Sequence, residues 1–161
     1  NFVRLVHNIL VACRAGDRFV PVGAAVGPPG VRTLGFHPCA DPANTGGGGT
    51  SADRLPGSEV SAVSFEALLS LADPSGGPIR LVKLDCEGGE WVVFDAPPAA
   101  LARVQAWTGE LHFGSPFARG RREEWVLSFL RERGYDAAVA DPTGRSDLNG
   151  FWAWRPGFEI L

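Results

Sequence analysis

The strongest constraint in this chain is a short apolar run that ends in a group of acids. Residues 79–84 are mainly apolar and predict a buried strand, and Asp85, Glu87 and Glu90 follow it with a pair of glycines among them. Ligands of open α/β sheets bind beyond the carboxyl ends of the strands. Acids crowded at such an end need a cation, hydrogen-bond donors or a catalytic role. The pattern therefore predicts a functional site at the turn after this strand.

Strand and helix patterns alternate along much of the remaining chain. This alternation predicts an α/β layered fold. The last two strands are joined only by a loop, so we expect them to pair antiparallel. Residues 38–57, with their run of four glycines, predict a loop. The predicted strands are 19–26, 31–36, 59–63, 79–84, 104–111, 135–140 and 151–154, and the predicted helices are 2–13, 65–72, a segment from 88, 99–103 and 121–133.

Composition narrows the class of protein. A length of 161 residues suits one domain, and a net charge of −3 gives no basic footprint for nucleic acid. The apolar runs are too short to span a membrane. The three cysteines, Cys13, Cys39 and Cys86, are far apart and show no disulfide or zinc pattern, which weakly favours a reducing, cytoplasmic compartment. Oligomeric state and compartment are not fixed by these features.

A second set of polar residues lies on the strand expected at 104–111. Glu110 and His112 are two positions apart, so both side chains should project from the same face. If this strand neighbours the one before Asp85, His112 could act there as a base or a metal ligand. A hydrogen-bonded structural histidine explains it equally well. Trp91, directly after the acids, is the tryptophan expected near a substrate, and Glu90 is either a substrate contact or a first-turn acid favoured by the helix dipole.

The same segment carries a resemblance to a known family. Val82-Lys83-Leu84-Asp85-Cys86-Glu87-Gly88-Gly89-Glu90 resembles the "IKIDVEGAE" signature of FkbM-type S-adenosylmethionine-dependent methyltransferases. Further segments resemble other motifs of that family in the same order: Asn1-Phe2-Val3-Arg4-Leu5, Ala24-Ala25-Val26-Gly27, Asn44-Thr45-Gly46, Val63-Ser64-Phe65-Glu66-Ala67-Leu68-Leu69 and Glu110-Leu111-His112. The resemblance covers most of the chain.

The resemblance implies a Rossmann-like class I methyltransferase fold, with a mostly parallel sheet and an antiparallel C-terminal strand. The family's first two strands and glycine-rich cofactor loop normally lie upstream, so residues 1–161 would form a partial domain without them. The implied reaction is transfer of a methyl group from S-adenosylmethionine to a hydroxyl oxygen of a small molecule or sugar. The implied catalytic residues are Asp85, Glu87, Glu110 and His112, the implied cofactor contacts are Ala25, Asn44, Gly46 and Asp85, the implied substrate contacts are Glu90 and Trp91, and no metal is implied.

Two alternatives follow from the residues themselves. One is a metal-dependent hydrolase or transferase that uses Asp85, Glu87, Glu110 and His112 as oxygen and imidazole ligands. The other is a non-catalytic α/β remnant that serves as an interaction module. A chelator separates the first alternative from the methyltransferase, because only a metal enzyme loses stability or activity with its metal.

Overall fold

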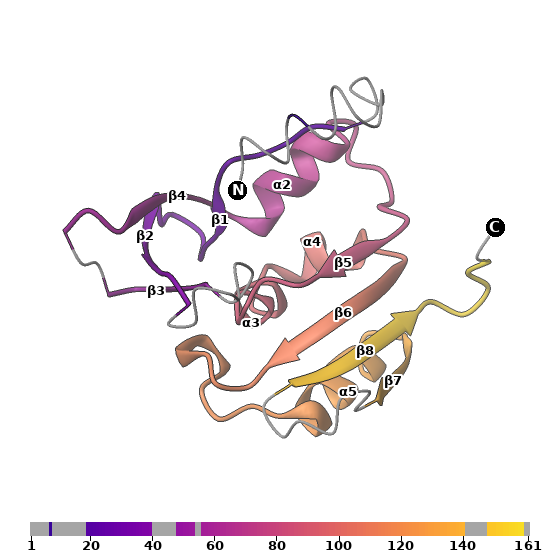
Figure 1. Ribbon diagram of the computed structural model, residues 1–161. Helices are drawn as coiled ribbons and strands as arrows, with labels where there is room; N and C mark the ends of the chain where they lie inside the picture. Colours follow the sequence, from indigo (N-terminus) through magenta and orange to yellow (C-terminus); the bar gives the residue numbers. More distant parts are fainter. Residues whose placement is uncertain (1–6, 8–18, 40–47, 54–55, 141–147, 160–161) are drawn as a thin grey trace.

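Two four-stranded mixed sheets form the framework of the molecule in the computed structural model, which describes residues 7, 19–39, 48–53, 56–140 and 148–159. The first sheet has the strand order β1-β4-β2-β3, and the second has the order β5-β6-β8-β7. Figure 1 shows the first sheet beside α2 and the second sheet crossing the opposite half of the molecule. The strands of the first sheet are β1 (Ala25–Val26), β2 (Thr33–His37), β3 (Gly49–Ser51) and β4 (Glu59–Val63).

The second sheet contains the longest strands and is accompanied by most of the helices. Parallel pairing joins β5 to β6, whereas β8 pairs antiparallel with both β6 and β7. The strands are β5 (Val82–Leu84), β6 (Ala106–His112), β7 (Asp136–Ala140) and β8 (Leu148–Trp154). The helices are α2 (Phe65–Ala72), α3 (Glu90–Phe94), α4 (Pro98–Ala102), the short 3₁₀ helix η3 (Pro116–Ala118) and α5 (Glu123–Arg131).

The predicted Rossmann-like, mostly parallel sheet is wrong. Within the described residues the strands divide between two sheets, and only the β1–β4 and β5–β6 pairs of named strands are parallel. The physical reason lies in the connections, because the described residues that link β2, β3 and β4 include no helix. A parallel pair needs a long crossover, whereas strands joined by loops pair antiparallel. The observed β2–β3 and β2–β4 pairs are antiparallel accordingly.

The observed bounds of individual strands and helices agree better with the sequence-based predictions than the sheet topology does. Strand β4 and helix α2 have the predicted bounds, and the antiparallel pairing of the last two strands is confirmed. The segment 38–57, predicted as loop, contains β3, and the strand expected at 19–26 is reduced to Ala25–Val26. The helix predicted at 2–13 lies outside the described residues except for His7, which is helical and exposed.

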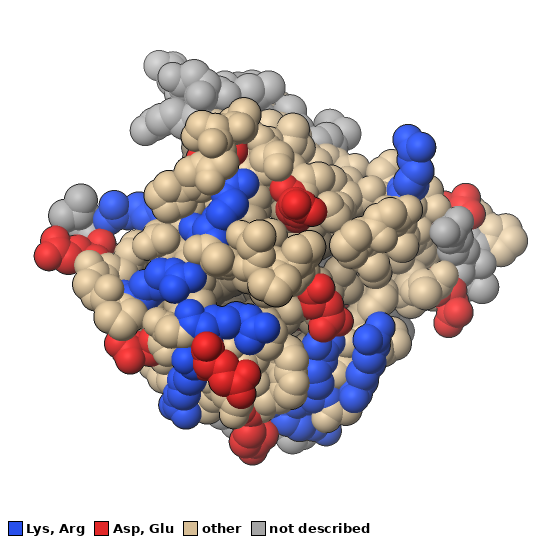
Figure 2. Space-filling model, turned by 180° about the vertical axis from the view of Figure 1, so that it is seen from behind, with Lys and Arg blue, Asp and Glu red and all other residues tan. Residues whose placement is uncertain are grey.

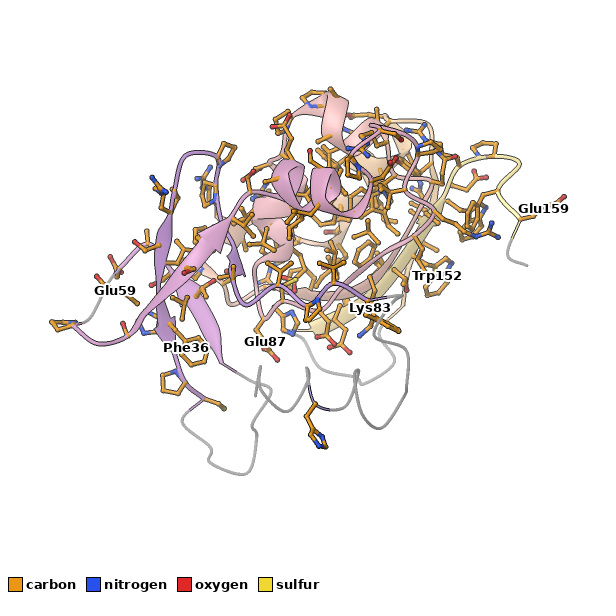
Figure 3. All side chains as sticks on the ribbon, turned by 90° about the horizontal axis from the view of Figure 1, so that it is seen from above. Phe36, Glu59, Lys83, Glu87, Trp152 and Glu159 are labelled. Carbon is orange, nitrogen blue, oxygen red and sulfur yellow. The ribbon has the colours of Figure 1, made fainter. Side chains whose placement is uncertain are left out.

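One hydrophobic core lies between the second sheet and its helices. Trp107 of β6 and Phe151 of β8 face Trp91 and Phe94 of α3, and all four side chains are buried. Phe65 of α2 packs on Trp107 with ring centroids 5.8 Å apart. The opposite face of the sheet carries exposed side chains, and Figure 3 shows Lys83 and Trp152 pointing away from the helices. The side chains of β5 and β6 that point away from this core are therefore the ones available to a functional site.

Candidate functional site

The turn between β5 and α3 aims Glu87 across the end of the second sheet. Glu87 adopts a left-handed backbone conformation with φ 49°, and Gly88 follows at φ 102°. A non-glycine residue in this region is strained and is held there by its surroundings. A Cβ on Gly88 would lie 2.3 Å from the Cβ of Ser115, whose hydroxyl donates to the Gly88 carbonyl at 3.1 Å. Glycine at this position therefore lets the segment after β6 close against the acidic turn.

His112 ends β6 at the same place and is oriented by a buried carboxylate. The Oε1 atom of Glu90, a fully buried residue, lies 3.0 Å from His112 Nδ1 and accepts a hydrogen bond from the Cys86 backbone N–H at 2.8 Å. An Nδ1–H bond to a carboxylate fixes the tautomer and leaves Nε2 as the free ring nitrogen. Nε2 lies 3.4 Å from Glu87 Oε2 and 4.0 Å from Glu110 Oε2. Glu90 therefore orients His112 so that its free ring nitrogen, Nε2, faces Glu87 and Glu110.

The acids also change the protonation of His112. Burial by itself would lower the pKa of His112, but the hydrogen bond to Glu90 and the charges of Glu90, Glu87 and Glu110 outweigh it, so the pKa is raised above its ordinary value. Nearby, burial raises the pKa of the Cys86 thiol to about 11, with the charges of Glu90 and Asp85 adding to the effect. Cys86 is thus a protonated, unreactive thiol at neutral pH.

Among the described residues, Asp85, Glu87 and His112 form the group whose ligand atoms lie close enough together to hold a cation. Each offers one ligand atom, and these atoms lie within 4.8 Å of one another. Asp85 also accepts a hydrogen bond from Lys83 Nζ at 3.0 Å, which partly offsets the negative charge. The bond to Asp85 raises the pKa of Lys83. Lys83 therefore pairs with Asp85 while remaining exposed.

The donor set fits a divalent metal ion. Two ligands bound at ~2.1 Å in a tetrahedral arrangement lie about 3.4 Å apart, as the His112 Nε2 and Glu87 Oε2 atoms do. A histidine held through its second nitrogen by a carboxylate is the usual support of a metal-bound imidazole. Glu90 Oε2 is buried and has no hydrogen-bond partner among the described residues. An uncompensated buried carboxylate oxygen is costly, and a cation beside His112 would reduce that cost.

Two cavities flank Glu87. One, of about 340 Å³, lies between the two sheets and is lined by His37, Thr50 and Ser51 on one side and by Glu87, His112 and Ser115 on the other. The second, of about 720 Å³, is lined by Asp85, Cys86, Glu87 and residues of β1. Ala25, expected to contact a cofactor, lies in the lining of the second cavity together with Asp85. A ligand in either cavity would reach the acidic turn.

The structure brings together most of the residues predicted for the site. Asp85, Glu87, Glu90, Glu110 and His112 all meet at the ends of β5 and β6. Glu90 contacts His112 and is sealed from any substrate by its burial. Trp91, expected near a substrate, is instead fully buried in the core, with its Nε1–H donating to the His112 carbonyl at 2.8 Å. Asn44 and Gly46 lie outside the described residues.

The sequence did not reveal His37 and Ser51 as neighbours of this site. His37 Nε2 lies 2.7 Å from Ser51 Oγ, across the antiparallel β2–β3 pair. The two residues are 14 positions apart and Ser51 lies in the segment predicted as loop, so no local pattern links them. The signal that could have found them is a strand prediction for β3, whose Thr50 is β-branched but whose neighbours include several glycines.

Charged side chains of both signs are mixed on the face seen in Figure 2. Lys and Arg stand among Asp and Glu there and form no single broad basic patch on that side of the molecule. None of the helices in the described part of the chain is both long and apolar enough to cross a membrane.

Comparison with known proteins points away from methyl transfer. The chain is 30% identical over 95 residues to proteins named RNA pyrophosphohydrolase from Cereibacter sphaeroides strains KD131 and ATCC 17023, an alignment that covers 59% of this chain and 51% of each relative. The chain therefore spans about half the length of the curated relatives it matches. No family model matches the chain, and no solved structure matches it.

The predicted methyltransferase activity is therefore wrong, since the named relatives are hydrolases and the sheet is not the mostly parallel one that a class I methyltransferase requires. The enzyme class implied by the resemblance fails with it. The FkbM resemblance itself and binding of S-adenosylmethionine have not been tested and stay predictions.

Proposed function

We propose that the chain is the catalytic part of a divalent-metal-dependent hydrolase that cleaves phosphoanhydride bonds, with the triphosphate end of an RNA as the substrate class. The observation that supports this most strongly is the grouping of Asp85, Glu87 and His112, with His112 aimed by the buried Glu90. The similarity to proteins named RNA pyrophosphohydrolase suggests the bond that is cleaved. The metal-dependent hydrolase was already one of the alternatives that the sequence left open.

The ligand types favour Mn²⁺ or Zn²⁺ over Mg²⁺. Imidazole suits the softer divalent ions, whereas Mg²⁺ keeps several waters and binds through carboxylates and phosphates. A bound divalent ion would polarise a phosphoryl oxygen and lower the pKa of a water molecule. Asp85, Glu87 and His112 would hold it, and Lys83 would release Asp85 for that purpose. Lys83 is exposed and can turn into solvent at little cost.

Glu110 is the residue placed to act as the general base. Its carboxylate lies 4.0 Å from His112 Nε2 but is not one of the three grouped ligands, and its side chain is half exposed. In hydrolysis the oxygen of a water molecule bonds to phosphorus, Glu110 takes the water proton, and the anhydride P–O bond breaks. The leaving phosphate or pyrophosphate keeps the electron pair of that bond. Phosphates are already anionic at neutral pH, so the leaving group needs no proton from the protein.

The test is release of pyrophosphate from a short RNA with a 5′ triphosphate, measured with Mn²⁺ and with a chelator. We expect activity only with the metal, and a loss of about 10²-fold or more in kcat for Glu110→Gln, as for removal of a general base. Glu87→Gln and His112→Gln should weaken metal binding measured by calorimetry. Glu59→Gln, an exposed glutamate on β4, is the matched control and should behave as the unmodified chain.

Calorimetry separates the ways in which this proposal can fail. Saturable Mn²⁺ binding without release of pyrophosphate would support the metal site but reject the triphosphate end of RNA as the substrate. Absence of metal binding would reject the hydrolase and favour the non-catalytic module.

A further inference from the structure

We infer that the cavity beside the metal ligands is a phosphate-binding subsite in which His37, held by Ser51, donates a hydrogen bond to a phosphoryl oxygen. This inference rests on the proposed function, because Glu87 on one wall of the cavity repels a phosphate unless a cation is bound there. It adds a second wall to the site, built from β2 and β3 of the other sheet.

The walls of the cavity have complementary chemistry. Glu87 and His112, on the side of the second sheet, belong to the group suited to a cation. His37, Thr50 and Ser51, on the side of the first sheet, offer imidazole and hydroxyl groups and no carboxylate. A phosphate between them would meet a cation on one side and neutral or cationic hydrogen-bond donors on the other. A volume of about 340 Å³ leaves room for a phosphate together with water.

The hydrogen bonds of Ser51 indicate that His37 Nε2 is the donor in the His37–Ser51 pair. Ser51 is 8% exposed, and its hydroxyl donates to the Asp53 carbonyl at 3.1 Å. Because that hydroxyl has a single proton, it accepts from His37 Nε2–H at 2.7 Å. A Ser–His pair can also serve as a nucleophile and its base. Here the serine proton is directed to a backbone carbonyl instead, so Ser51 orients His37 and is not itself set up to attack.

The remaining ring nitrogen of His37 is the atom that would meet the phosphate. No hydrogen bond to Nδ1 is found among the described residues, so that nitrogen is available to a ligand. Because Nε2–H is given to Ser51, Nδ1 donates from the imidazolium form of the ring, and an anionic phosphoryl oxygen beside the ring favours that form and accepts its hydrogen bond. Gly114 lies in the same lining and has no atom within 4 Å of the position a Cβ would take. The cavity wall therefore leaves free space at Gly114.

The experiment is a calorimetric titration of inorganic phosphate into the chain, with and without Mn²⁺, after the Mn²⁺ affinity has been measured separately. We expect phosphate to bind only with the metal present. His37→Gln and Ser51→Ala should each lower the phosphate affinity, the first by about tenfold or more, as for a lost hydrogen bond to a charged group. Both variants should bind Mn²⁺ as the unmodified chain does, because neither residue is a ligand.

His7→Gln is the matched control, since His7 is exposed and does not line the cavity. Sodium chloride at equal ionic strength controls for screening. Normal Mn²⁺ binding with an unchanged phosphate affinity in His37→Gln and Ser51→Ala would overturn the subsite and leave the proposed function standing. Phosphate binding that is equally strong without metal would also overturn it. If the unmodified chain does not bind Mn²⁺, both the proposed function and the phosphate subsite are overturned.

Discussion

Glu90 is the single residue on which the geometry of the candidate site depends most. It is fully buried, and one of its oxygens serves both the Cys86 backbone N–H and the His112 ring. A buried charge persists only when it is paired or bonded, and breaking such a pair by removing one partner is costly. Glu90 is therefore a positioning residue, which acts on a metal or substrate only through His112.

Replacing Glu90 with Gln should keep the hydrogen-bond acceptor and remove the charge. We expect the pKa of His112 to fall, because the hydrogen bond and charge of Glu90 are the largest contributions that raise it. Mn²⁺ affinity should fall about 10- to 100-fold, as for other groups that support a metal-bound histidine. Titration of His112 by NMR and calorimetry measure the two effects. Glu124→Gln, an exposed acid of α5, is the control, and an unchanged His112 pKa in Glu90→Gln would contradict the prediction.

His112 should also make the metal-free protein less stable as the pH rises. Its pKa in the folded state is raised above the ordinary value of 6.5. Its contribution to stability is therefore complete below that ordinary value and is lost as the pH rises through the folded-state pKa. Urea unfolding with a chelator at several pH values, on the unmodified chain and on His112→Gln, measures the difference. If the difference in the free energy of unfolding between the two proteins does not shrink with rising pH, the acids do not raise the pKa of His112.

At the scale of elements, the β5–β6 pair places the two halves of the candidate metal site side by side. Leu84, the last residue of β5, pairs with Gly109 of the parallel strand β6, so the residues that follow β5 lie beside the last residues of β6. A Cβ built on Gly109 would lie 1.9 Å from the Leu84 carbonyl oxygen, which is backbone and cannot turn away. Glycine at this position allows the close approach of the strands, and the approach brings Asp85 and Glu87 to His112.

Gly109→Ala should therefore destabilise the protein and separate the site residues. We expect a loss of at least about 2 kcal/mol in the free energy of unfolding, measured by urea denaturation, because the clash has to be relieved by a backbone shift. Metal affinity should fall as well. Gly114→Ala is the control, since an added Cβ there meets nothing within 4 Å. Equal free energies of unfolding for Gly109→Ala and Gly114→Ala would mean that β5 and β6 are not packed as closely as this at Gly109.

At the scale of the whole molecule, a bound cation should act as a cross-link between distant parts of the sequence. Asp85 and Glu87 follow β5, whereas His112 ends β6 on the other side of α3 and α4. A ligand that binds only the folded state stabilises it by about 2.7 kcal/mol at a concentration of ~100 times its Kd. For a chain of this size we expect Tm to rise by about 5 to 10 °C with Mn²⁺.

Differential scanning calorimetry with and without a chelator measures this effect. The double variant Asp85→Asn, Glu87→Gln should lose the increase in Tm. The control Glu59→Gln, at an exposed position of the other sheet, should retain it. An increase that survives in the double variant would place the metal elsewhere.

The sequence by itself determined the local elements and most members of the site. The periodicity of residues 59–63 and 65–72 predicted a strand and a helix with the observed bounds, because apolar spacing reports which face of an element is buried. The acids after β5 and the Glu110–His112 pair were also identified from their positions relative to strand ends. These are properties of neighbouring residues, so a pattern within a short window contains them.

Only the tertiary structure decided how those elements pair and what surrounds the acids. The division into two mixed sheets depends on contacts between segments far apart in the chain, as does the pairing of His37 with Ser51 across β2 and β3. The burial of Glu90 and Trp91 was decided in the same way, because helix α3 turns both residues away from solvent and towards β6. Local sequence patterns do not encode these long-range contacts, which arise when the elements pack around one core.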